Sequence, residues 1–313
     1  MSQEKVKVVF IGGYGRSGST LLDRMLGQVE GFVSVGELRH IWDRSFGENQ
    51  LCGCGEPFKK CAFWREVVER AFGAFESVDL SRVRALKRSV DRMRYIPQLM
   101  FPSLRSHEYQ MAFSEYAEIL SRLYKGIRDV SGSQFIIDST KDPSYGFILS
   151  AMQDVELHVV HLVRDSRAVA YSWQRKKRRP EIHWKEEYMP RYSPLKSAWE
   201  WGLMNGLVQL LGYTIPGRYT LVRYEDVVSQ PREALSRLLA GLGITNPNLD
   251  FINDRNIKLS VDHTVSGNPI RFQHGVIEVR PDTEWRHKMS TPHRVIVSAL
   301  TWPLLLKYGY FGK

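Results

Sequence analysis

A glycine-rich loop near the amino terminus carries the first candidate chemistry. The stretch VVFIGGYGRSGSTLLDRML runs from Val8 to Leu26. Its glycines Gly13 and Gly18, followed by Thr20, fit the G-x-x-x-x-G-x-[ST] frame of a phosphate-binding loop. The apolar run before the loop is typical of a buried parallel strand, and the pattern after it indicates a helix. A loop that precedes a helix N-terminus presents backbone N–H groups to an anion.

The loop departs from the nucleoside-triphosphate pattern at one position. Ser19 stands where such loops carry the lysine that binds β- and γ-phosphates, and Arg16 is the only cation in the loop. An arginine beside the backbone N–H groups of residues 17–20 suits a terminal phosphate joined to a less charged group, such as a sulfonate. Transfer of a sulfonate can rely on fixed cations and amides without a metal ion.

A second cluster, HLVRDSRAVAYSW, follows a predicted strand at residues 157–163. Arg164 comes at the end of that strand, and Ser172 lies about two turns into the helix that Asp165 or Ser166 would cap. Together the arginine and the serine could hold the second phosphate of a doubly phosphorylated nucleotide. The residues alone leave open that Arg164 pairs with Asp165 and that Ser172 is an ordinary helix-surface residue. His161, inside the apolar strand, is expected to be a hydrogen-bonded core residue.

Three cysteines lie close together in CGCGEPFKKCAFW. Cys52, Cys54 and Cys61 are potential zinc ligands, but a structural zinc site usually takes four ligands. The fourth would have to come from a distant histidine such as His40. We favour free thiols that pack in the core, and a disulfide within the trio and a metal site stay open as alternatives. None of the three is a candidate catalytic group.

Alternating strands and helices must position these groups. We predict strands at residues 8–11, 32–37, 135–137, 157–163 and 219–226, and helices at 63–75, 81–95, 108–128 and 231–242. This alternation predicts a parallel α/β sheet, in which ligands bind at the carboxyl ends of the strands. Residues 254–284 lack clear periodicity and are expected to form a long ordered loop over the site.

Composition limits the class of protein. The chain has 313 residues, of which 43% are hydrophobic, and carries 44 basic against 34 acidic residues, for a net charge of +10. This excess favours anionic partners. The run QRKKRR at residues 174–179 is read either as a solvated helix end or as a binding site for a nucleotide or an acidic acceptor. We see no apolar run near the roughly 18 residues of a membrane span, and therefore expect a soluble, cytoplasmic protein.

Two of these motifs together resemble those of a known enzyme family. GRSGSTLL, at residues 15–22, resembles the 5′-phosphosulfate loop of sulfotransferases that use 3′-phosphoadenosine 5′-phosphosulfate (PAPS). LVRDSRAVAYS, at residues 162–172, resembles their 3′-phosphate motif, and both motifs occur in the expected order. The resemblance implies the sulfotransferase fold, PAPS as sulfonate donor, and a 3′-phosphate held by Arg164 and Ser172.

The resemblance extends to the tyrosylprotein-sulfotransferase branch and its bacterial small-molecule relatives. VGELRHI looks like the segment with that branch's glutamate base, which implies Glu37, and STKDP looks like its lysine segment, which implies Lys141. LVRYEDVV implies that Tyr224 lies near the nucleotide. DTEWRHKM resembles a C-terminal segment of the family and implies Thr283 and Trp285.

The resemblance thus implies a full set of site residues. Glu37 would be the general base, and Arg16 and Lys141 would stabilise the charge that develops as adenosine 3′,5′-bisphosphate (PAP) leaves. The donor-binding set comprises Arg16, Ser17, Gly18, Ser19, Thr20, Arg164, Ser172, Tyr224, Thr283 and Trp285. We expect PAPS as the cofactor, in-line displacement, and no metal ion.

The predicted fold is a single sulfotransferase domain over residues 1–313, a P-loop-type parallel sheet flanked by helices, with a helical insertion around residues 50–130. The insertion has no counterpart in the family motifs, so the acceptor is narrowed only to a hydroxyl of a small molecule, glycolipid or natural product. Peripheral contact with a membrane-associated acceptor is consistent with this prediction of the acceptor class, whereas a nucleic-acid partner is not expected. The sequence does not indicate an oligomeric state.

Two alternatives belong to other classes. A P-loop kinase or NTPase would need a loop lysine and a magnesium-binding carboxylate, for which Asp138 is the candidate. A basic nucleic-acid-binding protein would interleave basic and aromatic residues, and residues 176–192 partly do so. Neither alternative accounts for both anion motifs.

Overall fold

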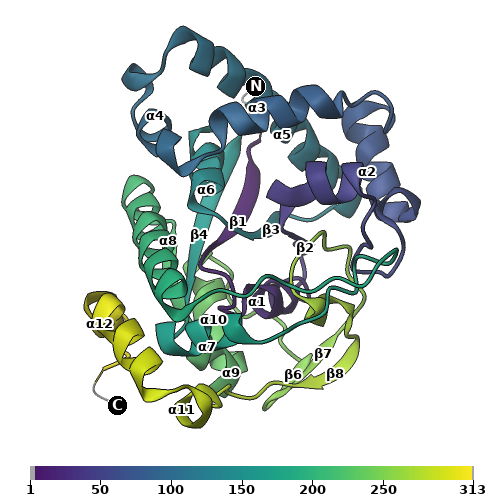
Figure 1. The fold of residues 1–313 in the computed structure, drawn as a ribbon. Helices are drawn as coiled ribbons and strands as arrows, with labels where there is room; N and C mark the ends of the chain where they lie inside the picture. Colours follow the sequence, from purple (N-terminus) through teal and green to yellow (C-terminus); the bar gives the residue numbers. More distant parts are fainter. Residues whose placement is uncertain (1–3, 312–313) are drawn as a thin grey trace.

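The computed structural model of the chain describes residues 4–311, which are built around a parallel β-sheet (Figure 1). Its strand order is β2-β3-β1-β4-β5. The strands are β1 (Val6–Gly13), β2 (Phe32–Gly36), β3 (Phe135–Lys141), β4 (Val155–Val163) and β5 (Tyr219–Arg223). Each corresponds to a strand predicted from an apolar run, and the predicted α/β class is confirmed.

Helices cover both faces of the sheet because its inner strands are apolar on both faces. Val8 and Phe10 of β1 pack into one hydrophobic cluster, and the alternate residues Val9 and Ile11 pack into another. The first cluster includes α2 (Ala62–Phe72), α3 (Leu80–Val90), α4 (Ile96–Met100), α5 (His107–Ser131), α6 (Pro143–Ala151) and α8 (Pro194–Thr214). The second includes α1 (Ser19–Leu26), α9 (Tyr224–Ser229) and α10 (Pro231–Gly241).

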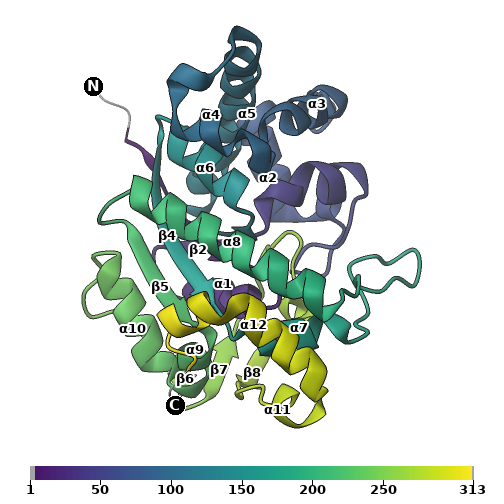
Figure 2. The same ribbon diagram turned by 60° about the vertical axis from the view of Figure 1, so that its left-hand side comes forward.

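The remaining helices close one end of the molecule. Helix α12 (Thr291–Lys307) packs beside α8, and α7 (Ser166–Gln174) lies against both (Figure 2). The short helix α11 (Trp285–Lys288) packs on α7. Within residues 4–311, no helix combines the length and the apolar character needed to cross a membrane.

Helices α2 to α5 form the stretch in which the sequence predicted an insertion between β2 and β3 (Figure 1). Side-chain caps fix two of their starts: Asp79 accepts from the N–H of Arg82 at 2.9 Å, and Ser106 accepts from that of Tyr109 at 3.1 Å. The predicted helix at 81–95 ends earlier, at Val90, and Asp91 is its C-cap residue. These helices share one hydrophobic cluster with β1.

The prediction that residues 254–284 form a long ordered loop was wrong in part. The segment contributes to a small antiparallel sheet of β6 (Ile252–Asn253), β7 (Asn256–Leu259) and β8 (Gly275–Glu278). Ile257 and Leu259 are buried, whereas Asn256 and Lys258 are exposed. This alternation indicates a strand. The predicted strand at 219–226 also ends early, at Arg223, where α9 begins.

Residues 262–268, here called the strap, return from this small sheet to the edge of the main one. Val265 pairs with β2: its N–H donates to the carbonyl of Val35, and its carbonyl accepts from the N–H of Glu37, both at 2.8 Å. The strap therefore continues the sheet at the carboxyl end of its edge strand. Gly36 makes this approach possible, since a Cβ there would lie 2.4 Å from the carbonyl oxygen of Val265.

We predict that Gly36→Ala destabilises the fold more than Gly31→Ala does. Both glycines have positive φ, of 78° and 81°, so both substitutions carry a backbone cost of about 1–2 kcal/mol. Only at Gly36 would the added Cβ also clash with a backbone atom, and this overpacking adds about 1–3 kcal/mol to the loss of stability. Urea unfolding of the two variants measures the difference, and equal losses would show that the strap yields easily at Gly36.

Candidate active site

A cavity of about 620 Å³ opens at the carboxyl ends of the parallel strands. Its lining includes Arg16, Glu37 and Arg164 from the loops after β1, β2 and β4, and Lys141 from the carboxyl end of β3. The strap and the segment between α7 and α8 cover it from outside the sheet. A concave site of this volume is suited to a small-molecule ligand or cofactor.

Arg16 is held beside the cavity with donors to spare. Its guanidinium stacks on Trp173 at 4.7 Å, and its carbonyl accepts from Nη1 of Arg164 at 2.9 Å. Its Nε and Nη2 are buried and have no hydrogen-bond partner among the described residues. Burial, and then the charge of Arg164, lower the pKa of Arg16. Two close cations with unused donors form a site that an anion would stabilise.

The rest of the glycine-rich loop leads into α1. Gly18 has φ of 90° and precedes the helix, and the ring of Tyr224 fills the space where a Cβ would lie. The hydroxyl of Ser17 is buried with no partner in the described part of the chain. Ser19 and Thr20 form the first turn of α1, where N–H groups lack intrahelical partners. The loop thus offers a helix N-terminus beside Arg16.

Arg164 is fixed by contacts on three sides. Its Nη2 donates to Oδ2 of Asp282 at 2.9 Å, its guanidinium stacks on Tyr224 at 4.5 Å, and its carbonyl accepts from Nε1 of Trp201 at 3.0 Å. The alternative pairing with Asp165 does not occur, because Asp165 caps α7 and binds Arg167. Asp282 thus occupies one of the donors that the sequence analysis assigned to a phosphate.

Ser172 lies near the end of α7 and lines the same cavity as Arg164 and Arg16. The two motifs that the sequence placed on separate elements therefore meet at one site. Tyr224 links them, since its ring contacts both Gly18 and the guanidinium of Arg164.

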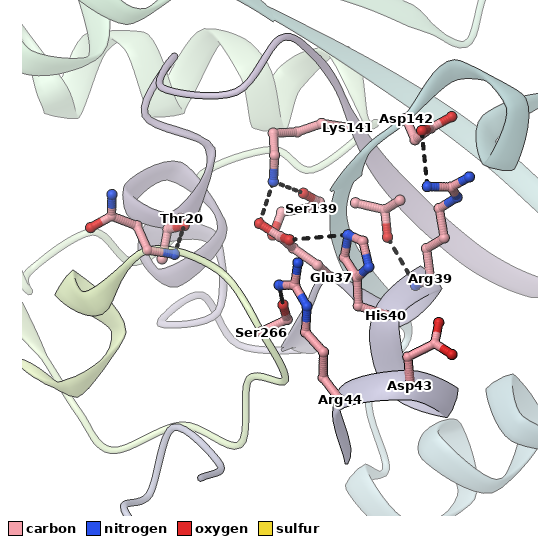
Figure 3. Close-up of polar contacts among 12 residues, drawn as sticks. Thr20, Glu37, Arg39, His40, Asp43, Arg44, Ser139, Lys141, Asp142 and Ser266 are labelled. Carbon is pink, nitrogen blue, oxygen red and sulfur yellow. Dashed lines mark hydrogen bonds and ion pairs between the residues drawn. The ribbon is translucent and has the colours of Figure 1, made fainter. Parts of the chain in front are cut away.

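Glu37 and Lys141 form the polar centre of the cavity floor. Figure 3 shows the ammonium of Lys141 directed at Oε1 of Glu37, and it also donates to the carbonyl of Ser139 at 2.9 Å. The second oxygen of Glu37 lies 3.7 Å from Nε2 of His40. Glu37 is 8% exposed and lines the cavity, so its carboxylate is accessible to a bound ligand but largely shielded from solvent.

His40 contributes little positive charge to this centre. Burial, and then the charges of Arg44 and Lys87, hold the pKa of His40 well below its usual value. Arg44 itself points toward the strap and donates to the hydroxyl of Ser266 (Figure 3). The neutral imidazole leaves Lys141 as the cation that contacts Glu37.

Backbone strain is concentrated around the cavity. Six non-glycine residues between 4 and 311 have positive φ, and three of them are asparagine or aspartate, which tolerate this region. The other three are Arg16, Lys141 and Ser266, with φ of 70°, 70° and 61°. Each position costs free energy of order 1–3 kcal/mol, and such strain is typical of functional sites.

The basic run 174–179 lies at the mouth of the cavity. Helix α7 ends at Gln174, and the chain then folds back on itself, with hydrogen bonds of 2.8 Å from Arg179 N to Glu187 O and from Met189 N to Lys177 O. Figure 2 shows this teal segment projecting beyond the helices that flank it. Nζ of Lys177 donates to Oδ1 of Asn268 in the strap at 2.8 Å.

Comparison with known proteins places the chain in a family. A model of the Sulfotransferase family matches residues 8–248. The chain belongs to the sulfotransferase family. None of the curated proteins matches it significantly.

Two solved sulfotransferase domains are similar to this chain at low sequence identity. The sulfotransferase domain from the curacin biosynthetic pathway is 16% identical, with 96% of this chain and 98% of that chain covered and a TM-score of 0.50. The sulfotransferase domain from the Synechococcus PCC 7002 olefin synthase is 20% identical, with 97% and 96% covered and a TM-score of 0.48. The first of these likenesses supports the predicted sulfotransferase fold.

Two predicted donor-binding residues of this sulfotransferase lie outside the 620 Å³ cavity described above. Thr283 and Trp285 line an adjoining cavity of about 660 Å³. Trp285 is buried against α7, and Arg167 stacks on its ring at 4.9 Å. Tyr224 and Asp282 line both cavities, so the two are neighbours. The structure therefore places Thr283 and Trp285 apart from the other predicted site residues, which lie at or beside the 620 Å³ cavity.

The sequence analysis missed several groups of the site. Asp282, Asn268 and Lys177 line the cavity but were not among the predicted site residues. The sequence signal for Lys177 was the basic run. Asp282 opens the segment DTEWRHKM, in which only Thr283 and Trp285 were singled out, and nothing marked Asn268. His161 does behave as predicted: it is buried between Tyr219 and Asn205, at 2.7 and 2.9 Å, and burial lowers its pKa to about 4.

We predict that Arg16 is needed for anion binding at the loop. Inorganic pyrophosphate should raise the thermal midpoint of the protein by a few degrees, since a ligand at 100 times its Kd adds about 2.7 kcal/mol of stability. Arg16→Ala should abolish the rise, whereas Arg191→Ala, at an exposed cation on the segment before α8, should keep it. Differential scanning fluorimetry gives the readout, and an undiminished shift in Arg16→Ala would place the anion elsewhere.

Proposed function

We propose that this sulfotransferase transfers a sulfonate from PAPS to a hydroxyl group of a small-molecule, glycolipid or natural-product acceptor. The supporting observation is the convergence of two anion-binding arginines, Arg16 and Arg164, at the ends of neighbouring strands. They are joined by the 2.9 Å hydrogen bond from Arg164 to the Arg16 carbonyl, and both keep buried N–H donors without partners in the described chain. PAPS carries phosphates at both its 5′ and 3′ ends, which matches two such loci.

In this proposal the 5′-phosphosulfate lies on the loop from Arg16 to Thr20, at the N-terminus of α1. The fixed N–H groups and the arginine neutralise it without a lysine. Arg164 and Ser172 hold the 3′-phosphate, which takes the place of the Asp282 carboxylate on Nη2 of Arg164. Tyr224 lies between the two loci. Thr283 and Trp285 stay assigned to the nucleotide, on the side of the adjoining cavity.

Glu37 is the proposed general base. The acceptor hydroxyl gives its proton to the Glu37 carboxylate as its oxygen forms a bond to sulfur. The bond between sulfur and the bridging oxygen of the 5′-phosphate breaks, and PAP leaves with that electron pair. Lys141, which contacts Glu37, orients the carboxylate and, with Arg16, stabilises the charge on the sulfonate and the leaving oxygen.

The acceptor would enter between the strap and the basic segment that follows α7. Both cover the cavity, and they are joined by the contact of Lys177 with Asn268. Desolvation and the charges of Arg16 and Arg175 lower the pKa of Lys177. A cluster of cations at the entrance favours an anionic donor and, beside it, a polar acceptor.

The kinase alternative is disfavoured by the surroundings of Asp138. Its carboxylate accepts from the hydroxyl of Tyr124 at 2.6 Å and from the N–H of Thr140 at 2.9 Å, and it is completely buried. Burial raises the pKa of Asp138 to about 6. A carboxylate held in this way stabilises the core below the sheet edge and is not exposed to bind a magnesium ion at a triphosphate.

Calorimetric titration with PAP, AMP and ATP, each with and without magnesium, tests the donor. We expect tight binding of PAP that does not depend on magnesium. AMP should bind more weakly by up to about 10⁴-fold, because the groups that expect the 3′-phosphate are left unpaired. Preference for ATP with magnesium would overturn the proposal in favour of a kinase, and equal binding of PAP and AMP would remove Arg164 and Ser172 from the site.

The role of Glu37 is tested by Glu37→Gln. The amide keeps the shape of the side chain but cannot accept the proton, so we expect kcat to fall by about 10²- to 10⁴-fold while the Kd for PAP changes little. Sulfation of an acceptor found in a screen with labelled PAPS gives the rate. Glu30→Gln, at an exposed glutamate between α1 and β2, is the matched control and should keep full activity. A Glu37→Gln enzyme with unaltered kcat would mean that another group is the base.

A further inference from the structure

The cysteine segment and the strap meet at a cluster of four potential metal ligands. The sulfurs of Cys52, Cys54 and Cys61 and a ring nitrogen of His263 all lie within 4.8 Å of one another. The fourth ligand that the sequence analysis sought at His40 is thus supplied by another histidine. His40 lies instead beside Glu37.

The spacing of these atoms matches tetrahedral zinc. With Zn–S bonds of about 2.3 Å and Zn–N bonds of about 2.0–2.1 Å, a tetrahedron puts two sulfurs about 3.8 Å apart and a sulfur about 3.6 Å from a nitrogen. Sγ of Cys54 and Sγ of Cys61 are 3.7 Å apart. Nδ1 of His263 lies 3.8 Å from Sγ of Cys52 and 3.2 Å from Sγ of Cys61. A disulfide would need about 2.05 Å between sulfurs.

The backbone around the cysteines is shaped as a ligand-bearing turn. Cys52 donates its N–H to the carbonyl of Glu56 and accepts from the N–H of Gly55, both at 2.8 Å, so Cys52 and Cys54 lie on one tight loop. Cys61 immediately precedes α2, and its own N–H donates to the carbonyl of Pro57 at 3.1 Å. Backbone hydrogen bonds thus shape the turn that carries Cys52 and Cys54 and fix the chain at Cys61 independently of any ion.

His263 is oriented toward the thiols by its own contacts. Its ring stacks on Phe63 at 4.9 Å, and its carbonyl accepts from Nε1 of Trp64 at 2.7 Å. Phe63 and Trp64 belong to α2, the helix that Cys61 immediately precedes. Such contacts, which fix the ring of a histidine, are a regular part of metal sites.

The surroundings also suit the charge of the occupied site. Three thiolates, a neutral imidazole and Zn²⁺ carry a net negative charge. Arg271 is fully buried, and its guanidinium donates to the carbonyl of Leu51 at 2.6 Å and to that of Thr264 at 2.5 Å. These carbonyls flank Cys52 and His263, so a buried cation lies beside the cluster and offsets its charge.

The geometry points to a structural zinc site formed by Cys52, Cys54, Cys61 and His263. Four protein ligands leave no open position, so the ion would cross-link the chain and take no part in the transfer reaction. It would tie the cysteine turn to the strap at His263. Two residues further on, Val265 pairs with β2, and Asn268 donates to the hydroxyl of Thr20 at 3.2 Å. The ion thereby holds the strap over Glu37 and the glycine-rich loop.

Metal analysis of the purified full-length chain, prepared under reducing conditions without added metal, tests the site. We expect about one zinc ion per chain by inductively coupled plasma mass spectrometry. Cys54→Ser and His263→Ala should lose it. His263→Cys should keep it, because a four-cysteine site also binds zinc, and His107→Ala, at an exposed histidine on α5, is the matched control.

A second measurement remains decisive if the loss variants fail to fold. Exchange of the wild-type protein with Co²⁺ should give the absorption bands of tetrahedral thiolate ligation, and removal of the metal should raise hydrogen exchange at residues 262–268. Zinc-free protein whose three thiols all react with Ellman's reagent, or whose mass shows an internal disulfide, would overturn the proposal. Neither measurement needs a donor or an acceptor, so this result is independent of the proposed activity.

Discussion

The parallel register of β1 with its two neighbours is the constraint on which the site depends. Gly12 of β1 pairs with Lys141 of β3, and Gly13 pairs with Leu162 of β4. The glycine-rich loop, Lys141 and Arg164 therefore leave the sheet at one level, although they are far apart in sequence. A slip of one residue would turn every side chain of β1 to the other face and exchange the residues that pack into the two hydrophobic clusters.

The site that this register creates is costly for the protein without a ligand. Arg16 and Arg164 are close cations with unused buried donors among the described residues, and Arg16 and Lys141 also have strained backbones. The family offers a physical reason for accepting such a cost: groups fixed in advance stabilise developing charge without rearranging during the reaction. The contact of Asp282 with Arg164 offsets part of the cost in the free protein.

The features that could be predicted from the sequence are those that local sequence patterns determine. The strands are apolar runs, and the loop at Arg16 and the motif at Arg164 each lie within one strand-to-helix connection, so their positions followed from the sheet. Tyr224 was placed in a strand but starts a helix, since the hydrophobic pattern does not mark that boundary. His263 comes from a stretch that no period or motif marks, and Asp282 directly precedes the residues singled out in DTEWRHKM. The role of His263 arises only when the strap returns to β2, and that of Asp282 only when it meets Arg164. Tertiary contacts of this kind have no local sequence signature.

The strap explains how parts of the chain outside the recognised motifs affect the site. Residues 262–268 contact the cysteine turn at one end and the candidate base and the glycine-rich loop at the other. Gly267 approaches both, since a Cβ there would lie 3.3 Å from Oγ1 of Thr20 and 3.7 Å from Oε1 of Glu37. Any change in the cysteine turn that moves the strap therefore alters the space beside Glu37. In the proposed reaction, acceptor selection can in this way depend on the insertion between β2 and β3 while Arg16 and Arg164 stay fixed by the sheet.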